Sequence, residues 1–82
     1  MRPLCKKVMN SFHCRELCAV GDVLSAADII IDIKDEGRND IVDAICELAR
    51  AHFVGLDKER VLVTLEEKGV DFLRKHTNND TI

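Results

Sequence analysis

The sequence predicts a small, mostly helical α+β domain, and two patterns carry that prediction. Residues 53–56 and 60–65 read as two short strands around the polar turn Asp57-Lys58-Glu59, with Val61, Val63 and Leu65 alternating onto one face of the second strand. Before them, residues 39–52 carry apolar side chains at helical spacing, in a stripe made of Ile41, Val42, Ile45, Leu48, Ala49 and Phe53. A helix, a hairpin and a closing helix are therefore expected in that order.

The N-terminal part of the chain reads as two further helices. Apolar residues recur at helical spacing from Leu4 to Val20, although the polar run 13–16 allows a break, and Gly21 is expected to end this helix. Ser25 is a candidate N-cap for a second helix over 26–34. Isoleucines at every second position from Ile29 to Ile33 also fit a strand, and we prefer the helix.

The remaining boundaries follow from turn and capping residues. Residues 35–38 form a turn, and Asn39 is expected to cap the third helix. A last helix is expected over 66–76 with Val70 and Leu73 facing inward, followed by a polar tail over 77–82. The chain of 82 residues is thus predicted to be one domain, divided into 1–20, 22–54, 53–65, 66–76 and 77–82.

Composition narrows the class of protein. A single core is marginal at this length, so a homodimer is expected. Apolar runs such as 29–31 are too short to cross a bilayer, and the first residues lack the apolar core of a signal peptide, so we expect a cytoplasmic protein with no membrane partner. The net charge of -3 disfavours nucleic-acid binding, although residues 1–15 are basic and lack acids.

The cysteines and histidines do not form a recognisable reactive or metal-binding pattern. The four cysteines lack paired CxxC spacing, and His13, Cys14 and Cys18 have no evident fourth ligand, so no metal is expected. Cys18 and Cys46 fit small core residues, whereas Cys5 or Cys14 could form an intersubunit disulfide. The sequence contains no glycine-rich phosphate loop and no nucleophile with an evident base, so we expect that the protein is not an enzyme and needs no cofactor.

The segment 57–76 resembles the wing and following helix of MarR- and PadR-like winged helix-turn-helix regulators. In that family a charged turn and a strand lead into a Leu-Thr-Glu-Lys-Gly motif, which Leu65, Glu67, Lys68 and Gly69 match. Glu66 departs from the motif by replacing a threonine that would cap the helix. Upstream, 24–37 is similar to the first helix of the helix-turn-helix, and 38–54 to its recognition helix and the entry to the wing.

The resemblance implies a winged helix with a two- or three-stranded wing that binds double-stranded DNA, as a dimeric repressor of transcription. The start of the third helix would face base edges, through Arg38, Asn39, Asp40, Asp43 and Ala44. Lys58 and Arg60 would reach phosphate or the minor groove, and Lys6, Lys7 and Arg15 flanking phosphates. A solvated turn, an N-cap and a solvated helix face explain the same residues equally well. The first and last helices are the expected dimer surfaces.

Two alternatives stay open. Asp40, Asp43 and Glu47 would repel phosphate, so the chain could instead be a non-catalytic protein-binding module or small inhibitor that uses an acidic surface. Residues 22–69 are also similar to the start of phosphotransferase-system IIA domains, with a strand over 29–33 and a helix over 58–67, but without that family's histidine motif. The β-branched residues of 61–64 favour a strand over that helix.

Overall fold

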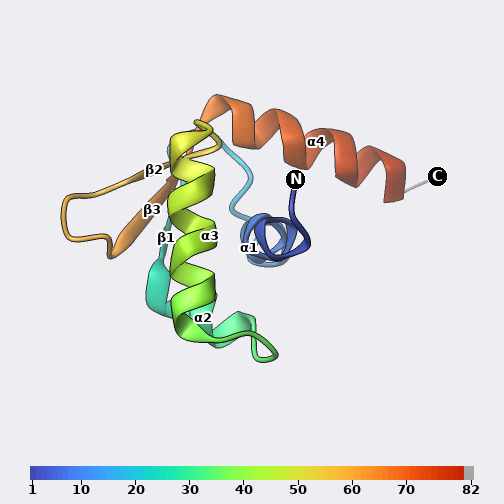
Figure 1. Ribbon diagram of the computed structural model, residues 1–82. Helices are drawn as coiled ribbons and strands as arrows, with labels where there is room; N and C mark the ends of the chain where they lie inside the picture. The colour runs from blue at the N-terminus through green and yellow to red at the C-terminus, as the bar shows by residue number, and fades with distance from the viewer. Residues whose placement is uncertain (81–82) are drawn as a thin grey trace.

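The computed structural model describes the backbone of residues 1–80 and the side chains of residues 1–75. It contains, in chain order, α1 (Pro3–Cys14), β1 (Val23–Ser25), α2 (Ala26–Asp32), α3 (Arg38–Arg50), β2 (Val54–Leu56), β3 (Leu62–Leu65) and α4 (Glu67–Asp80) (Figure 1). The predicted α+β class with a helical majority is confirmed. None of the described helices is long and apolar enough to cross a membrane.

The three strands form one antiparallel sheet in the order β1-β3-β2. Val63 pairs with Leu24 on one side and with Leu56 on the other, so β3 lies in the centre. One face of the sheet carries the buried residues Leu24, Val54, Val63 and Leu65, while Val23 and Leu62 are exposed on the other face. The predicted hairpin is confirmed, but β3 starts at Leu62, two residues later than predicted. Val61, predicted on the same face as Val63 and Leu65, therefore precedes the strand and is exposed.

The core lies between the inner face of the sheet and the helices. α1 contributes Cys5, Val8, Met9 and Phe12 to it, all buried, and its most extensive helix partner is α3. The facing side of α3 carries Ile41, Ala44, Ile45 and Leu48, all buried. Val42, Ala49 and Phe53 of the predicted stripe are only half-buried. They lie at the edge of the buried face, which is centred on Ile41, Ala44, Ile45 and Leu48.

The first helix ends at Cys14, so the prediction that Gly21 ends it is wrong. Glu16 adopts a left-handed backbone conformation with φ of 61°. Its N–H donates to the carbonyl of His13, and the Leu17 N–H donates to that of Phe12. This is the paired hydrogen-bond pattern of a Schellman C-cap, made here without glycine. Gly21, with φ of 91°, lies in the loop before β1.

Segment 26–32 is a helix, which excludes a strand over 29–33. The Ser25 hydroxyl accepts from the Asp28 N–H at 3.1 Å, so the predicted N-cap is confirmed. Because β3 occupies residues 62–65, the helix over 58–67 required by the IIA-like alternative is also wrong.

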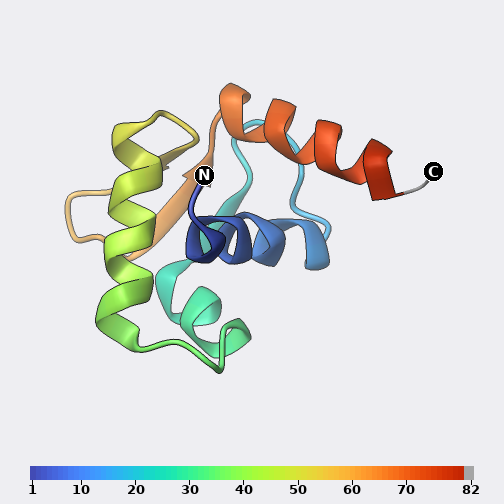
Figure 2. The same ribbon diagram turned by 45° about the vertical axis from the view of Figure 1, so that its right-hand side comes forward.

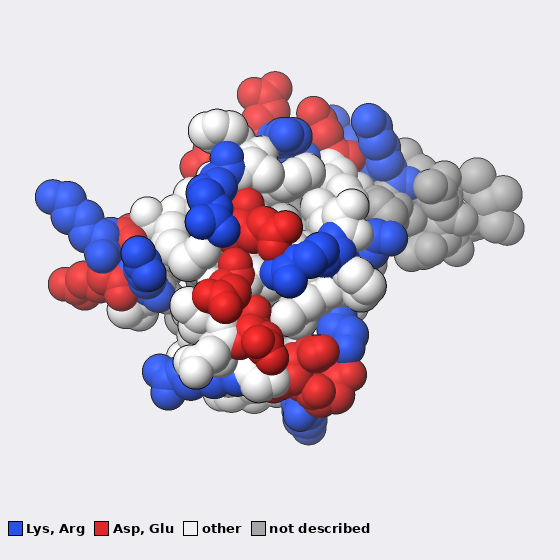
Figure 3. Space-filling model, in the orientation of Figure 1, with Lys and Arg blue, Asp and Glu red and all other residues white. Residues whose placement is uncertain are grey.

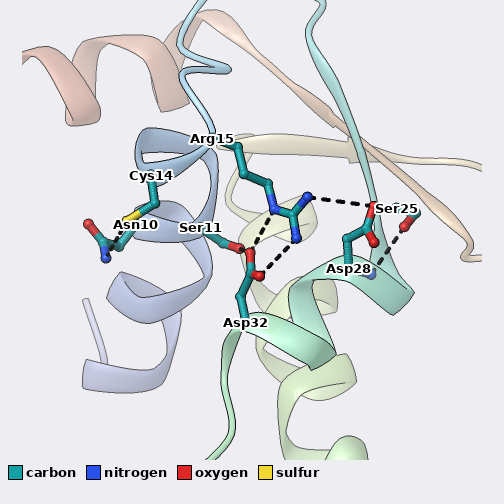
Figure 4. Close-up of polar contacts among 7 residues, drawn as sticks. All are labelled: Asn10, Ser11, Cys14, Arg15, Ser25, Asp28 and Asp32. Atoms are coloured by element: carbon teal, nitrogen blue, oxygen red, sulfur yellow. Dashed lines mark hydrogen bonds and ion pairs between the residues drawn. The ribbon is translucent and has the colours of Figure 1, made fainter.

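A polar cluster fastens α2 to the end of α1 (Figure 4). The Arg15 guanidinium donates to both carboxylate oxygens of Asp32, at 2.8 Å each, and lies 3.9 Å from Asp28. The buried Ser11 hydroxyl donates to the same Asp32 carboxylate. These hydrogen bonds, Arg15 first and Ser11 second, lower the pKa of Asp32 from 3.8 to about 2. The carboxylate therefore stays ionised at neutral pH.

The boundaries of α3 differ from the predicted ones at its start. Gly37 occupies the N-cap position and Arg38 is the first helical residue, so the prediction that Asn39 caps the helix is wrong. At the other end His52, with φ of 67°, completes a second Schellman pattern with bonds from His52 to Ala49 and from Phe53 to Leu48.

The last helix leaves the body of the domain as a projecting arm (Figure 2). Val70 and Leu73 are buried as predicted, and the helix runs to Asp80 rather than ending at His76. Of the predicted tail, residues 81 and 82 lie outside the described residues. Gly69 lets α4 approach the hairpin, because a Cβ there would meet the Phe53 carbonyl oxygen and lie 2.8 Å from a Leu65 methyl carbon.

Candidate nucleic-acid interface

The outward side of α3 is the surface on which four of the predicted DNA contacts fall. Arg38, Asn39, Asp40 and Asp43 are all exposed. Asn39 and Asp43 are four residues apart and so lie on one line along the helix, opposite the buried stripe. Ala44 is fully buried in the core, so the prediction that it faces a base edge is wrong. Helical spacing explains the error, since Ala44 is adjacent to Ile41 and Ile45 on the inner face.

The first turn of α3 presents two side chains able to read bases. Arg38 and Asn39 occupy the first two helical positions because Gly37 takes the cap. Within the described residues neither side chain has a hydrogen-bond or ion-pair partner, so both are available to an incoming ligand. The fork of an arginine matches guanine, and the amide of an asparagine matches adenine.

A row of acidic side chains follows the same helix (Figure 3). It consists of Asp40, Asp43 and Glu47, which are three and four residues apart and therefore adjacent on the surface. Glu47 pairs with Arg2 from the start of the chain at 2.6 Å, and its charge raises the pKa of Arg2. Asp40 and Asp43 have no such partner among the described residues, so the row keeps a negative field beside Arg38.

The hairpin tip carries the second group of predicted contacts. The Asp57 carboxylate accepts from the N–H groups of Val61 and Leu62, at 2.7 and 3.1 Å, and so fixes the turn. Lys58 and Arg60 are exposed on that turn, and Arg60 has φ of 59°. Both cations stand at the tip of a hairpin that projects from the body (Figure 1). Asp57 and Glu59 balance their charge.

The cations predicted to contact flanking phosphates from the N-terminal helix are mostly engaged in pairs within the protein. Lys7 donates to Asp35 at 2.6 Å, and this hydrogen bond raises the pKa of Lys7 and lowers that of Asp35. Arg15 is held by Asp32, which leaves Lys6 as the exposed cation of the predicted set on this helix. The sequence reasoning missed Arg50, which is exposed at the end of α3 and shares a line with Asp43. The sequence could have indicated this, because Arg50 follows Asp43 by seven residues, or about two helical turns, and so lies on the same side of the helix.

The cysteines are separate thiols. Cys5 is buried and Cys18 is half-buried, and burial raises the pKa of both. Cys14 is exposed and accepts from the Asn10 amide at 3.4 Å. The described side chains include no group of three or more His, Cys, Asp or Glu residues placed to hold a metal ion.

Comparison of the chain with protein-family models, with curated proteins and with solved structures finds no match.

Proposed function

We propose that this chain is a winged helix-turn-helix module that binds double-stranded DNA and regulates transcription by occupying its site. The observation that carries the proposal is the succession of α2, a turn, α3 and the β2–β3 hairpin, with α3 exposed along its outward side. In this arrangement the second helix of the pair enters the major groove and the hairpin is the wing beside it.

Arg38 and Asn39 have the central roles in this proposal. Both stand at the N-terminal end of α3, from which recognition helices reach base edges. Arg38 bonds a guanine, Asn39 bonds an adenine, and Lys58 and Arg60 contact backbone phosphates from the wing. Lys6 supplies a flanking phosphate contact, whereas Lys7 must first leave Asp35.

The acids of α3 set the expected strength of binding. Asp40 and Asp43 repel phosphate, so few contacts drive association and non-specific affinity is low. A carboxylate facing the groove also accepts from the cytosine amino group, so Asp43 favours a cytosine in the site. The protein is expected to discriminate among sequences more sharply than its weak overall affinity suggests.

The proposed active form is a homodimer in which the projecting α4 of one protomer meets that of the other. The face of α1 that carries Val8 and Phe12 is buried within the protomer, whereas α4 projects from the body of the domain (Figure 2). A dimer of this kind reads two half-sites about one helical turn apart, or roughly 34–36 Å.

The test is a salt titration of binding to a mixed-sequence duplex by fluorescence anisotropy. Arg60→Gly removes a phosphate contact, so it should weaken binding and reduce the slope of log affinity against log salt by about 1. Arg38→Ala removes a base contact, so it should weaken binding without that change in slope. Glycine is chosen at residue 60 because it removes the cation while suiting the left-handed backbone there. Lys34→Ala, at an exposed cation outside the assigned contacts and outside α4, is the matched control.

Asp43→Asn gives a prediction of opposite sign, since removing the acid should tighten non-specific binding at low salt. A duplex that fails to bind the parent or Asp43→Asn at low salt would overturn the DNA proposal. An unchanged affinity in Arg38→Ala and Arg60→Gly would overturn the assigned surface.

A second candidate function is a protein-binding module that uses the acidic row of α3. The observation that favours it is a shallow hollow of about 340 Å³ lined by Glu36, Asp40 and Asp43 together with residues 2–4. This candidate is preferred if the parent protein binds no duplex at low salt. It then predicts that Asp43→Asn weakens the binding of a basic partner protein.

A further inference from the structure

The segment that joins α2 to α3 has little apolar anchorage. Within α2 only Ala26 and Ile29 are buried, and a hollow of about 590 Å³ lies between the end of that helix and α1. Ile33 and Ile41 are buried, but none of residues 34–40 between them is. Apolar packing therefore fixes both ends of this segment and leaves the turn itself without a buried side chain.

Polar contacts to α1 take the place of that anchorage. Lys7 donates to Asp35 at 2.6 Å. Arg15 donates to both carboxylate oxygens of Asp32, which also accepts from the buried Ser11 hydroxyl (Figure 4). Lys7, Ser11 and Arg15 follow one another at four-residue steps, so they share one side of the first helix and its C-cap. These contacts together form a polar seam between α1 and the segment from α2 to α3.

The polar seam reaches the start of the proposed recognition helix. Asp35 precedes the N-cap residue Gly37 by two positions, and Arg38 follows as the first residue of α3. A shift of the turn would therefore shift Arg38 and Asn39 as well. Because a binding constellation must be held to within about 0.5 Å, the support of this turn matters for contacts to base edges.

Two roles for the cations of the seam make opposite predictions. The sequence predicts that Lys7 and Arg15 bind flanking phosphates. If they do, the paired acid competes with phosphate, and removing that acid should tighten binding. If the cations instead hold the turn through their acids, removing an acid should weaken binding, although the protein then carries less negative charge.

We propose that Lys7 and Arg15 are positioning residues of the DNA interface, which orient α2 and the turn before Arg38 through Asp35 and Asp32 and do not contact phosphate. The pairs are already formed in the free protein, and Lys7 stays with Asp35 in the complex. This inference rests on the proposed DNA function and adds to it the means by which the recognition helix is oriented.

The first test compares acid variants in duplex binding by fluorescence anisotropy, with circular dichroism to check that each is folded. Asp35→Asn should weaken binding about threefold and Asp32→Asn about fivefold, within the range of exposed ion pairs. Glu36→Gln is the matched control, because it makes the same change of charge in the same turn. Glu36 makes no side-chain hydrogen bond or ion pair with another described residue, so its variant should not weaken binding.

Cation variants separate positioning from phosphate contact. Lys7→Gln should weaken binding about threefold without changing the slope of log affinity against log salt, whereas a slope reduced by about 1 would show a phosphate contact and overturn the proposal. Exchanging the charges, with Lys7→Asp and Asp35→Lys together, should restore affinity to within about twofold of the parent. Lys7→Asp alone should not restore it.

Hydrogen exchange reports on the turn in the absence of DNA. The Ile33 N–H donates to the Ile29 carbonyl and the Ile41 N–H to the Gly37 carbonyl, at 3.1 Å each. Both amides should exchange about threefold faster in Asp35→Asn than in Glu36→Gln. Equal exchange in these two variants, or tighter duplex binding by Asp35→Asn, would overturn the positioning role and leave DNA binding in place. A parent protein that binds no duplex would overturn the proposed function itself, and the positioning role with it.

Discussion

The carboxylate that joins α1 to α2 provides a stability test whose size follows from its pKa. Asp32 accepts from Arg15 and Ser11, and its folded pKa of about 2 lies below the ordinary value of 3.8. A difference of that size corresponds to about 2.5 kcal/mol for a fully shielded group. The Asp32 side chain is 27% exposed, so solvent screening reduces the expected contribution to about 1 kcal/mol.

The sign of the pH dependence follows from the direction of the shift. Because the folded pKa is the lower one, the stabilisation is complete above the unfolded value and is lost as pH falls from about 4 toward 2. At about pH 3 roughly half of it remains. Asp32→Asn should therefore lower the free energy of unfolding by about 1 kcal/mol at neutral pH, and by less in acid.

Urea denaturation followed by circular dichroism, at neutral pH and near pH 3, measures both quantities. The matched control is Asp35→Asn, which removes the acid of the more exposed Lys7–Asp35 pair and should change stability little. Equal stability of Asp32→Asn and the parent at neutral pH would refute the assigned contribution. A difference that stays undiminished in acid would refute its electrostatic origin.

Three further substitutions test local backbone features by thermal or urea unfolding. His52→Gly should stabilise the protein by about 1 kcal/mol, because glycine accepts the left-handed conformation that ends α3; a loss of stability would contradict the C-cap assignment. Gly69→Ala should destabilise it by about 1–3 kcal/mol, since the methyl group meets the Phe53 carbonyl; a neutral change would contradict that close approach. Ser25→Ala should cost about 1 kcal/mol through the lost bond to the Asp28 N–H, and an unchanged midpoint would count against the cap.

The parts of the fold that the sequence predicted correctly depend on local spacing. The stripe from Ile41 to Leu48 gives α3 because residues three and four apart share a face, and the alternation of Val63 and Leu65 gives β3 because strand side chains alternate. Ser25 caps α2 through a bond to a residue three positions along. Each signal is complete within a few neighbouring residues.

The errors come from features that the local sequence does not encode. The end of α1 depends on Glu16, which adopts a backbone conformation usually taken by glycine. The prediction therefore placed the end of the helix at Gly21, the first glycine in the chain. β1 has only three residues and exists because β3 pairs with it. At the interface, Lys7 pairs with Asp35, which lies 28 positions further along the chain. The sequence around either residue does not indicate this pairing.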